Sequence, residues 1–350
     1  MTRKNTAFGY VILSGILLYF WMQICFRALQ GDRWMKFKKI ALMGAGAIGS
    51  YLVWGLSEKA AAGEIDFCVV ANGERKERFE RNGFMINGEK YRPVIMTPEE
   101  ARGADLLVIT LKYGSLRPAL DDIRRMVGPD TVVMSLMNGV DTEEIIGEAL
   151  GGTKQIVYSL MKIASERWGN RVNFNAETTI GMIYGETEEN GGASRTDRTD
   201  ALNALFEGTG MHYRVTDCIL SEMWTKFRLN VQNNQPQAII GVGVGAYRDS
   251  EHVRFMQQKL REEVTKIGEA KGICFELADP SSASGSPVKD RARYSTLQDL
   301  DARRHTEVDM FSGAVMRMGR ELGIPTPYNE FAYHAIKALE EKNDGLFNYD

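Results

Sequence analysis

A glycine-rich turn between an apolar run and an amphipathic stretch constrains the fold of this chain more than any other feature. Residues 39–43 have the length of a buried parallel strand and lead directly into Gly44-Ala45-Gly46-Ala47-Ile48-Gly49. A helix-like stretch follows, and a second apolar run covers residues 65–70. Strand, glycine turn, helix and strand in this order predict the first part of a Rossmann-type, dinucleotide-binding α/β domain.

The glycines of this turn have separate expected roles. Gly44 permits the tight turn, Gly46 lets a pyrophosphate approach the backbone, and Gly49 allows the helix to pack closely on the strand. The N-terminus of the following helix presents the positive end of its dipole to a phosphate. We therefore predict that residues 44–49 bind the phosphates of a dinucleotide.

The residues after the second apolar run indicate which dinucleotide binds. Folds that bind NAD usually carry an acidic residue there, which holds the adenosine ribose. This chain reads Ala71-Asn72-Gly73 there, so no acidic residue stands at the end of the strand. Glu74, Arg75 and Lys76 follow. Two cations within reach of a 2′-phosphate favour NADP (NADPH). The alternative is that both are solvated charges on a helix.

Two further apolar runs, at 104–110 and 131–136, predict more parallel strands. Lys112 and Asn138 stand just after them. Ligands of open parallel sheets bind at the carboxyl ends of the strands, so both residues are candidates for cofactor contacts. Turn chemistry alone would also explain an asparagine before Gly139.

The remaining sheet and loop signals are weaker. Residues 155–161 and 178–184 read as strands, whereas the polar, glycine-rich stretch 186–200 predicts a surface loop. Residues 281–286 predict an exposed connection between helices.

Helical periodicity dominates from Ser221 onward. Residues 222–234 read as one helix on which Lys226, Asn230 and Asn234 recur every four residues and share a face. Facing a binding site, this row would supply a proton donor and hydrogen-bonding groups for a polar organic substrate. If the row faces solvent instead, it indicates no functional site.

A second polar block spans residues 294–309 and contains Ser295, His305 and Glu307. Its charge pattern alone favours a charged surface helix. His305 is one of only four histidines, and its charged neighbours favour an ion-paired residue over a catalytic one.

Composition narrows the functional class. The chain has 350 residues, 43 basic and 46 acidic, with a net charge of −3, which argues against nucleic acid as a partner. This length predicts two domains. The four cysteines include no CxxC pair, which argues against a structural zinc site or a disulfide scaffold and favours a reducing, cytoplasmic compartment.

The first 34 residues differ from the rest. Residues 5–26 carry no charge and have the length of a transmembrane helix, and the basic residues after them would leave the main body in the cytoplasm. A membrane partner is expected only if this segment is a genuine anchor. The alternative is that natural translation starts at Met35, and the intact mass of the native protein distinguishes the two.

From Met35 to about Lys342 the chain resembles the ketopantoate reductase (2-dehydropantoate 2-reductase) family. The matching blocks are the glycine turn, Thr110-Leu-Lys112, Asn138-Gly139, Glu222-x-Trp-x-Lys-x-x-x-Asn-x-x-x-Asn234, Ser295-x-Leu-Gln-Asp-x-x-Ala-Arg-Arg-x-Thr-Glu307-Val-Asp309 and Gly323-Ile-Pro-Thr-Pro327. The resemblance implies a Rossmann-type NADP-binding domain at 35–217 and an all-α domain at 218–350, similar to the C-terminal domain of 6-phosphogluconate dehydrogenase. It also implies an NADPH-dependent oxidoreductase that reduces 2-dehydropantoate to pantoate in pantothenate and coenzyme A biosynthesis.

The same resemblance assigns roles to single residues. Lys226 matches the catalytic lysine that protonates the keto oxygen, and Glu307 matches its accompanying acid. Asn230, Asn234 and Ser295 match residues that hold substrate oxygens. Asn138 and Lys112 match cofactor contacts on the nicotinamide side, and no metal is implied. A homodimer is compatible with the resemblance, although the sequence does not fix the oligomeric state.

The chain departs from the pattern of this family at two places, and two alternative functions stay open. Many relatives carry an arginine where this chain has Asn72, which leaves the 2′-phosphate to Arg75 or Lys76. The helix also reads Asn234-Gln235-Pro236, where relatives place proline next to the asparagine. The alternatives are a reductase of another 2-oxo acid on the same fold, and an NADP-binding regulator without turnover.

Overall fold

The apolar runs of the first part of the chain assemble into an eight-stranded sheet in the order β12-β11-β8-β7-β6-β1-β2-β5. Neighbouring strands are parallel except for β8 and β11, which are antiparallel. In chain order the strands are β1 (Lys39–Met43), β2 (Asp66–Val70), β5 (Val94–Met96), β6 (Leu106–Ile109), β7 (Val132–Ser135), β8 (Ile156–Lys162), β11 (Gly181–Gly185) and β12 (Tyr213–Val215).

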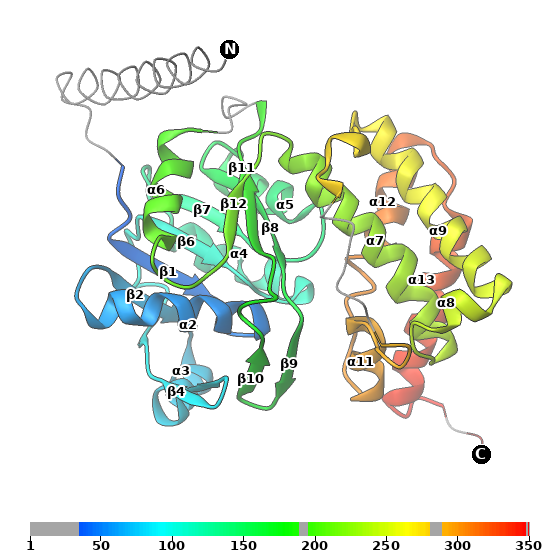
Figure 1. The fold of residues 1–350 in the computed structure, drawn as a ribbon, viewed down its shortest axis with the longest axis horizontal. Coiled ribbons are helices and arrows are strands. Elements are labelled where there is room, and N and C mark those ends of the chain that lie inside the picture. Colours follow the sequence, from blue (N-terminus) through cyan, green and yellow to red (C-terminus); the bar gives the residue numbers. More distant parts are fainter. Residues whose placement is uncertain (1–34, 189–194, 281–288, 348, 350) are drawn as a thin grey trace, which may run out of the picture. The chain divides into compact units, whose positions relative to one another are not determined.

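This computed structural model describes residues 35–188, 195–280, 289–347 and 349. The chain divides into two units, residues 1–36 and 37–350, and the second holds both the sheet and a helical half (Figure 1). The candidate membrane segment at 5–26 and the connection at 281–286 lie outside the described residues. Within the described part of the chain, no helix has both the length and the apolar character of a membrane span.

Helices connect the strands of the sheet and cover it. They are α2 (Ala47–Ala61), α3 (Gly73–Asn82), the 3₁₀ turn η1 (Tyr113–Ser115), α4 (Leu116–Met126), α5 (Thr142–Leu150) and α6 (Asp197–Phe206). The central strands β6 and β7 are buried along their whole length, as expected for a parallel sheet with both faces covered. The Rossmann-type architecture predicted from the glycine turn is therefore confirmed.

A smaller four-stranded sheet in the order β4-β3-β10-β9 lies beside α2. Its strands are β3 (Phe84–Ile86), β4 (Glu89–Tyr91), β9 (Ser165–Trp168) and β10 (Arg171–Phe174). β9 and β10 form an antiparallel hairpin that turns at Gly169 and Asn170. These strands could not be predicted from the sequence, because each has only three or four residues.

The second half of the chain is helical, as predicted. It contains α7 (Ile219–Ile240), α8 (Ala246–Asp249), α9 (Glu251–Ala270), η3 (Phe275–Leu277), α11 (Ser295–Asp301), α12 (Ser312–Leu322) and α13 (Pro327–Asn343). Figure 1 shows α7 beginning beside the sheet and extending into the helical half. Met223, Phe227 and Val231 recur every four residues on α7, and all three are buried in the core of this half.

Three predicted boundaries differ from the structure. The surface loop expected at 186–200 is wrong in its last residues, because Thr196 caps α6 by accepting a hydrogen bond from the Thr199 backbone N–H and the helix starts at Asp197. The helix expected at 222–234 is longer, because α7 runs from Ile219 to Ile240 with Pro236 inside it. Next to this proline, the Gln237 side chain donates to the Ala292 carbonyl and accepts from the Tyr294 backbone N–H.

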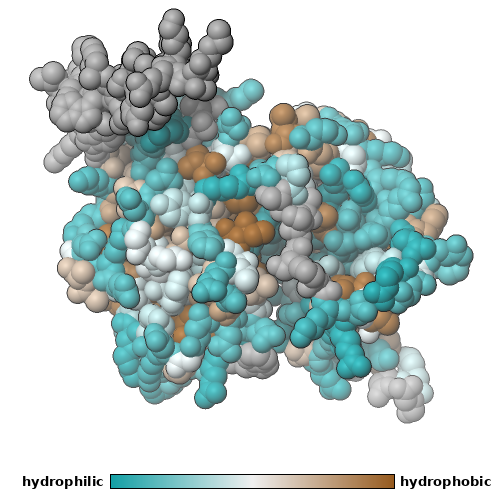
Figure 2. Space-filling model, viewed as in Figure 1, coloured by the Kyte–Doolittle hydropathy of each residue, from teal (hydrophilic) through white to brown (hydrophobic). Residues whose placement is uncertain are grey.

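The surface helix expected at 294–309 is also wrong. α11 ends at Asp301, because Arg303 takes a left-handed backbone conformation with φ of 51°. Four of its residues, including Asp299, are buried. The helix therefore packs against the rest of the protein instead of lying in solvent. On the face shown in Figure 2, hydrophilic residues predominate and hydrophobic residues occur in small groups.

Candidate active site

The glycine turn between β1 and α2 has the close contacts that its sequence requires. Gly44 has φ of +104°, and a Cβ there would lie 2.8 Å from the Thr110 carbonyl carbon. A Cβ on Gly49 would lie 2.2 Å from the Gly44 carbonyl oxygen. The Thr110 hydroxyl fixes the turn by donating to that same oxygen at 2.5 Å.

Gly46 is the N-cap of α2 and makes no side-chain cap hydrogen bond. Apart from one arginine nitrogen at 3.6 Å, nothing approaches the position of its missing Cβ closely. An open glycine at a helix N-terminus suits a pyrophosphate, because backbone N–H groups and the helix dipole both favour an anion there. The residues present thus fit a dinucleotide.

The end of β2 distinguishes the two candidate cations. Asn72 is the N-cap residue of α3 but makes no side-chain cap hydrogen bond, and its amide instead donates to the Asp122 carboxylate at 3.5 Å. Lys76 is ion-paired with Glu80 at 3.0 Å and donates to the Ile95 carbonyl at 2.7 Å. Arg75 is exposed and forms no ion pair with a described residue. Of the two cations, Arg75 is therefore the one open to a phosphate.

Lys226 connects the helical half to the carboxyl end of the sheet. Its ammonium donates to the Asn138 side-chain oxygen at 2.8 Å, so α7 and the turn after β7 meet at this contact. Burial and, to a smaller extent, the nearby Lys162 lower the pKa of Lys226 to about 8, against the opposing charges of Glu307 and Glu143. A lysine tuned in this way can give up a proton near neutral pH.

Glu307 lies close enough to Lys226 to influence its charge and is bound to the other half of the protein. Its carboxylate accepts a hydrogen bond from the backbone N–H of Tyr113 at 3.1 Å. Tyr113 begins the short turn after β6, so Glu307 also sits at the carboxyl end of the sheet. Lys226 and Glu307, which were predicted separately, therefore lie near enough to each other for their charges to interact.

Lys112 makes a contact that the sequence did not predict. Its ammonium pairs at 2.8 Å with Asp299 of α11, whose side chain is 8% exposed and also pairs with Arg304. The Lys112 side chain itself is 59% exposed. No local pattern marks Asp299 as its partner, because the two residues lie 187 positions apart in the chain.

The predicted substrate residues lie along α7 and at the start of α11. The Asn234 amide donates to the Ser295 hydroxyl at 3.3 Å, so these two residues are brought together. Asn230 lies one turn before Asn234 on α7 and is half-buried. The spacing that predicted a shared helix face is thus present in the structure.

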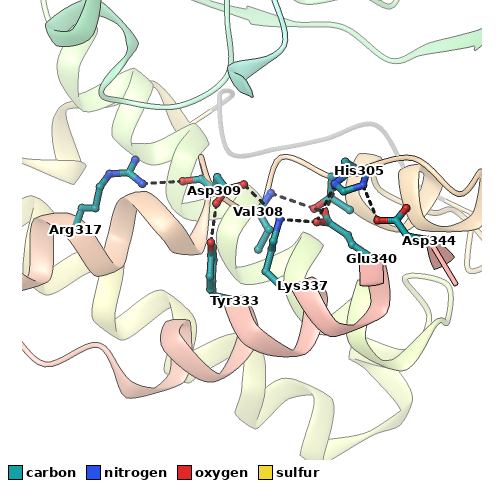
Figure 3. A network of polar contacts seen from close by, with 9 residues as sticks. His305, Val308, Asp309, Arg317, Tyr333, Lys337, Glu340 and Asp344 are labelled. Carbon is teal, nitrogen blue, oxygen red and sulfur yellow. Dashed lines mark hydrogen bonds and ion pairs between the residues drawn. The ribbon is translucent and has the colours of Figure 1, made fainter. Parts of the chain in front are cut away.

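A polar network holds the segment that carries Glu307 (Figure 3). The buried carboxylate of Glu340 on α13 accepts from the Thr306 backbone N–H at 2.7 Å and from the Thr306 hydroxyl at 2.6 Å. On the other side of Glu307, the Asp309 carboxylate accepts from Tyr333 at 2.8 Å and its carbonyl accepts from Arg317. Both flanks of Glu307 are therefore fixed to helices.

His305 belongs to this network and not to the site. Its imidazole is 65% exposed and lies 2.9 Å from Asp344 and 3.5 Å from Glu340. The interpretation of His305 as an ion-paired residue agrees with these contacts.

Two titratable groups near Lys226, one buried and one half-buried, were not predicted from the sequence. Burial raises the pKa of Glu143, at the start of α5, to about 8, and burial lowers the pKa of Lys162, at the end of β8, to about 8. Both interact electrostatically with Lys226. Glu143 stands five residues after the predicted Asn138, a proximity that gives a weak signal, whereas nothing in the sequence marks Lys162.

Comparisons with known proteins agree with this architecture. The family described as "Ketopantoate reductase PanE/ApbA" matches residues 40–185, and "Ketopantoate reductase PanE/ApbA C terminal" matches residues 218–340. A 2-dehydropantoate 2-reductase of Mesorhizobium japonicum is 30% identical over 320 residues, which cover 86% of this chain and 97% of the relative. One from Pyrococcus horikoshii is 29% identical over 315 residues, with 88% and 99% covered.

Solved structures show the same fold. A PanE/ApbA family ketopantoate reductase from Ralstonia eutropha has a TM-score of 0.72 at 23% identity, with 89% of this chain and all of that chain covered. A ternary structure of D-mandelate dehydrogenase with NADH and anilino(oxo)acetate has a TM-score of 0.71 at 21% identity, with the same coverage. The two domain matches and the full-length relatives establish that this chain belongs to the ketopantoate reductase family.

Proposed function

We propose that the chain catalyses the NADPH-dependent reduction of 2-dehydropantoate to pantoate, the reductive step towards pantothenate and coenzyme A. The observation that carries the proposal is the contact between Lys226 and Asn138, which holds a proton donor at the carboxyl end of a dinucleotide-binding sheet. The relatives named 2-dehydropantoate 2-reductase over nearly their full length support the choice of substrate. The cysteine pattern supports a cytoplasmic reaction.

Reduction of a ketone builds negative charge on its oxygen, so the reaction requires a donor at that atom. In the proposed mechanism the Lys226 ammonium hydrogen-bonds the keto oxygen and transfers a proton to it. Asn138 orients the ammonium, and Glu307 keeps a negative charge near it. Asn230, Asn234 and Ser295 hold the other substrate oxygens. The bound nicotinamide supplies the hydride.

The test is NADPH oxidation by the full chain with ketopantoate and a panel of other 2-keto acids. Fast turnover with ketopantoate alone is the expected result. Turnover with a different 2-keto acid alone would keep the mechanism and replace the substrate, an alternative favoured by the D-mandelate dehydrogenase of the same fold. Tight NADPH binding without turnover on any acid would support the regulator alternative and overturn the proposal.

Arg75 is proposed to bind the 2′-phosphate, because Lys76 is engaged by Glu80. Arg75→Ala is expected to weaken NADPH binding about tenfold, the scale of one charge-assisted hydrogen bond, and to leave NADH binding unchanged. Fluorescence titration with each cofactor measures both. Arg81→Ala, at the other end of the same helix, is the matched control. If Arg75→Ala loses affinity for NADH and NADPH equally, this role is contradicted. Similar turnover of the wild type with both cofactors would remove the NADP preference.

The pH dependence follows from the lowered pKa of Lys226. Its protonated form is the donor, and its folded-state pKa is about 8. The kcat/KM for reduction should therefore be nearly constant below about pH 7 and fall up to about tenfold per pH unit above pH 8. A profile measured from pH 6 to 10 checks this. A flat profile to pH 10 would show that Lys226 titrates near its ordinary value or is not the donor.

A further inference from the structure

The β9–β10 hairpin places an arginine over the glycine turn. The guanidinium Nη1 of Arg167 lies 3.6 Å from the position that a Cβ on Gly46 would occupy. Gly46 is the glycine whose missing side chain leaves room for a pyrophosphate. Arg167 is far from this turn in sequence, and only the fold of the hairpin beside α2 brings it there.

The register of the hairpin explains the direction of this side chain. Arg167 pairs with Val172 across the two antiparallel strands, so both side chains lie on one face. Val172 is buried in the core that also contains residues of α2. The Arg167 Nε donates to the Gly169 carbonyl at 3.1 Å, which fixes the guanidinium and leaves its two terminal nitrogens for another partner. Arg171, one residue from Val172, is on the opposite face.

Three other guanidinium groups lie close enough to Arg167 to act on it electrostatically. Burial lowers its pKa, and Arg304, Arg78 and Arg75 lower it further. Among the described residues, no carboxylate lies within ion-pair distance of Arg167. Arg304 is paired with Asp299, whereas Arg167 has no such carboxylate beside it in the part of the chain that the structure describes. An anion at Arg167 would therefore relieve the repulsion between it and the neighbouring guanidinium groups.

The geometry points to Arg167 as a further cofactor-binding residue that contacts the dinucleotide pyrophosphate from the side opposite the N-terminus of α2. The assignment rests on the proposed function. It differs from the role of Arg75, because Arg75 lies on α3 at the end of β2, whereas Arg167 lies over Gly46. Every dinucleotide carries the pyrophosphate, but only NADP carries the 2′-phosphate. The two arginines should therefore have different effects on the two cofactors.

Titration of the full chain with NADPH and with NADH tests the assignment. Arg167→Ala is expected to weaken the binding of both cofactors by a similar factor, about 10- to 100-fold, as for a lost charge-assisted contact to phosphate. Arg167→Lys should recover part of the affinity. Arg171→Ala, on the opposite face of the same hairpin and exposed, is the matched control and should bind as the wild type does. Higher salt should narrow the gap between wild type and Arg167→Ala.

Three results would overturn the assignment. Unchanged binding of both cofactors by a folded Arg167→Ala would show that the hairpin does not contact them. A loss confined to NADPH would move Arg167 to the 2′-phosphate. Failure of the wild type to bind either cofactor would overturn the proposed function together with this inference, and it is distinguished from the other two by the wild-type titration alone.

Discussion

Lys226→Ala is expected to lower kcat by about 10²- to 10⁴-fold, the usual contribution of a general acid. The loss should appear mainly in kcat, because the proton is transferred only as negative charge develops on the keto oxygen. NADPH affinity should stay close to that of the wild type, since Lys226 is held by Asn138 and not by the glycine turn. Steady-state kinetics and a fluorescence titration measure the two quantities.

Lys226→Arg separates proton donation from positive charge. An arginine keeps the charge but does not release its proton near neutral pH, so this variant should also lose most of its turnover. Lys266→Ala, an exposed lysine on α9, is the control and should be fully active. Unchanged turnover in Lys226→Ala would remove the proposed mechanism. If Lys226→Arg is highly active and Lys226→Ala is not, the role of Lys226 is to stabilise negative charge and not to donate a proton.

The sequence predicted those parts of the fold that have strong local patterns. Residues 39–43 coincide with β1, and the runs at 104–110 and 131–136 contain β6 and β7, because buried parallel strands are continuously apolar. The four-residue period of Lys226, Asn230 and Asn234 placed them correctly on one helix. The packing of Gly44 and Gly49 also followed from the motif, since the turn leaves no room for a Cβ at either position.

Features that depend on contacts between distant residues could not be predicted. Asp299 pairs with Lys112 across 187 positions, and Arg167 reaches Gly46 only because a short hairpin folds beside α2. Lys76 is held partly by the local pair with Glu80 on α3 and partly by contacts from outside that helix, with Glu100 and the Ile95 carbonyl. The contacts from outside the helix could not be predicted. Local pattern gives the type of an element, whereas the partners of a charge depend on the tertiary fold.

Glu340→Ala tests whether the network around residues 305–309 positions Glu307. Glu340 is 2% exposed and accepts three hydrogen bonds within 2.7 Å, two from Thr306 and one from Lys337. Its removal leaves these donors without their acceptor. We expect the free energy of unfolding to fall by about 2–4 kcal/mol, within the range for hydrogen bonds to a charged group and for a broken buried ion pair. Urea denaturation measures this change.

The catalytic consequence follows from the position of Thr306, directly before Glu307 in the chain. Once Thr306 is released, the Glu307 carboxylate should no longer be held at the Tyr113 N–H, so kcat should fall in variant protein that is still folded at the assay temperature. Glu341→Ala removes the same charge from the next, exposed position of α13 and should change neither stability nor kcat. Glu340→Gln keeps an acceptor oxygen for Thr306 and should retain more of both than Glu340→Ala. If folded Glu340→Ala turns over as fast as the wild type, Glu307 is positioned by its contact with Tyr113 alone, and the network serves only stability.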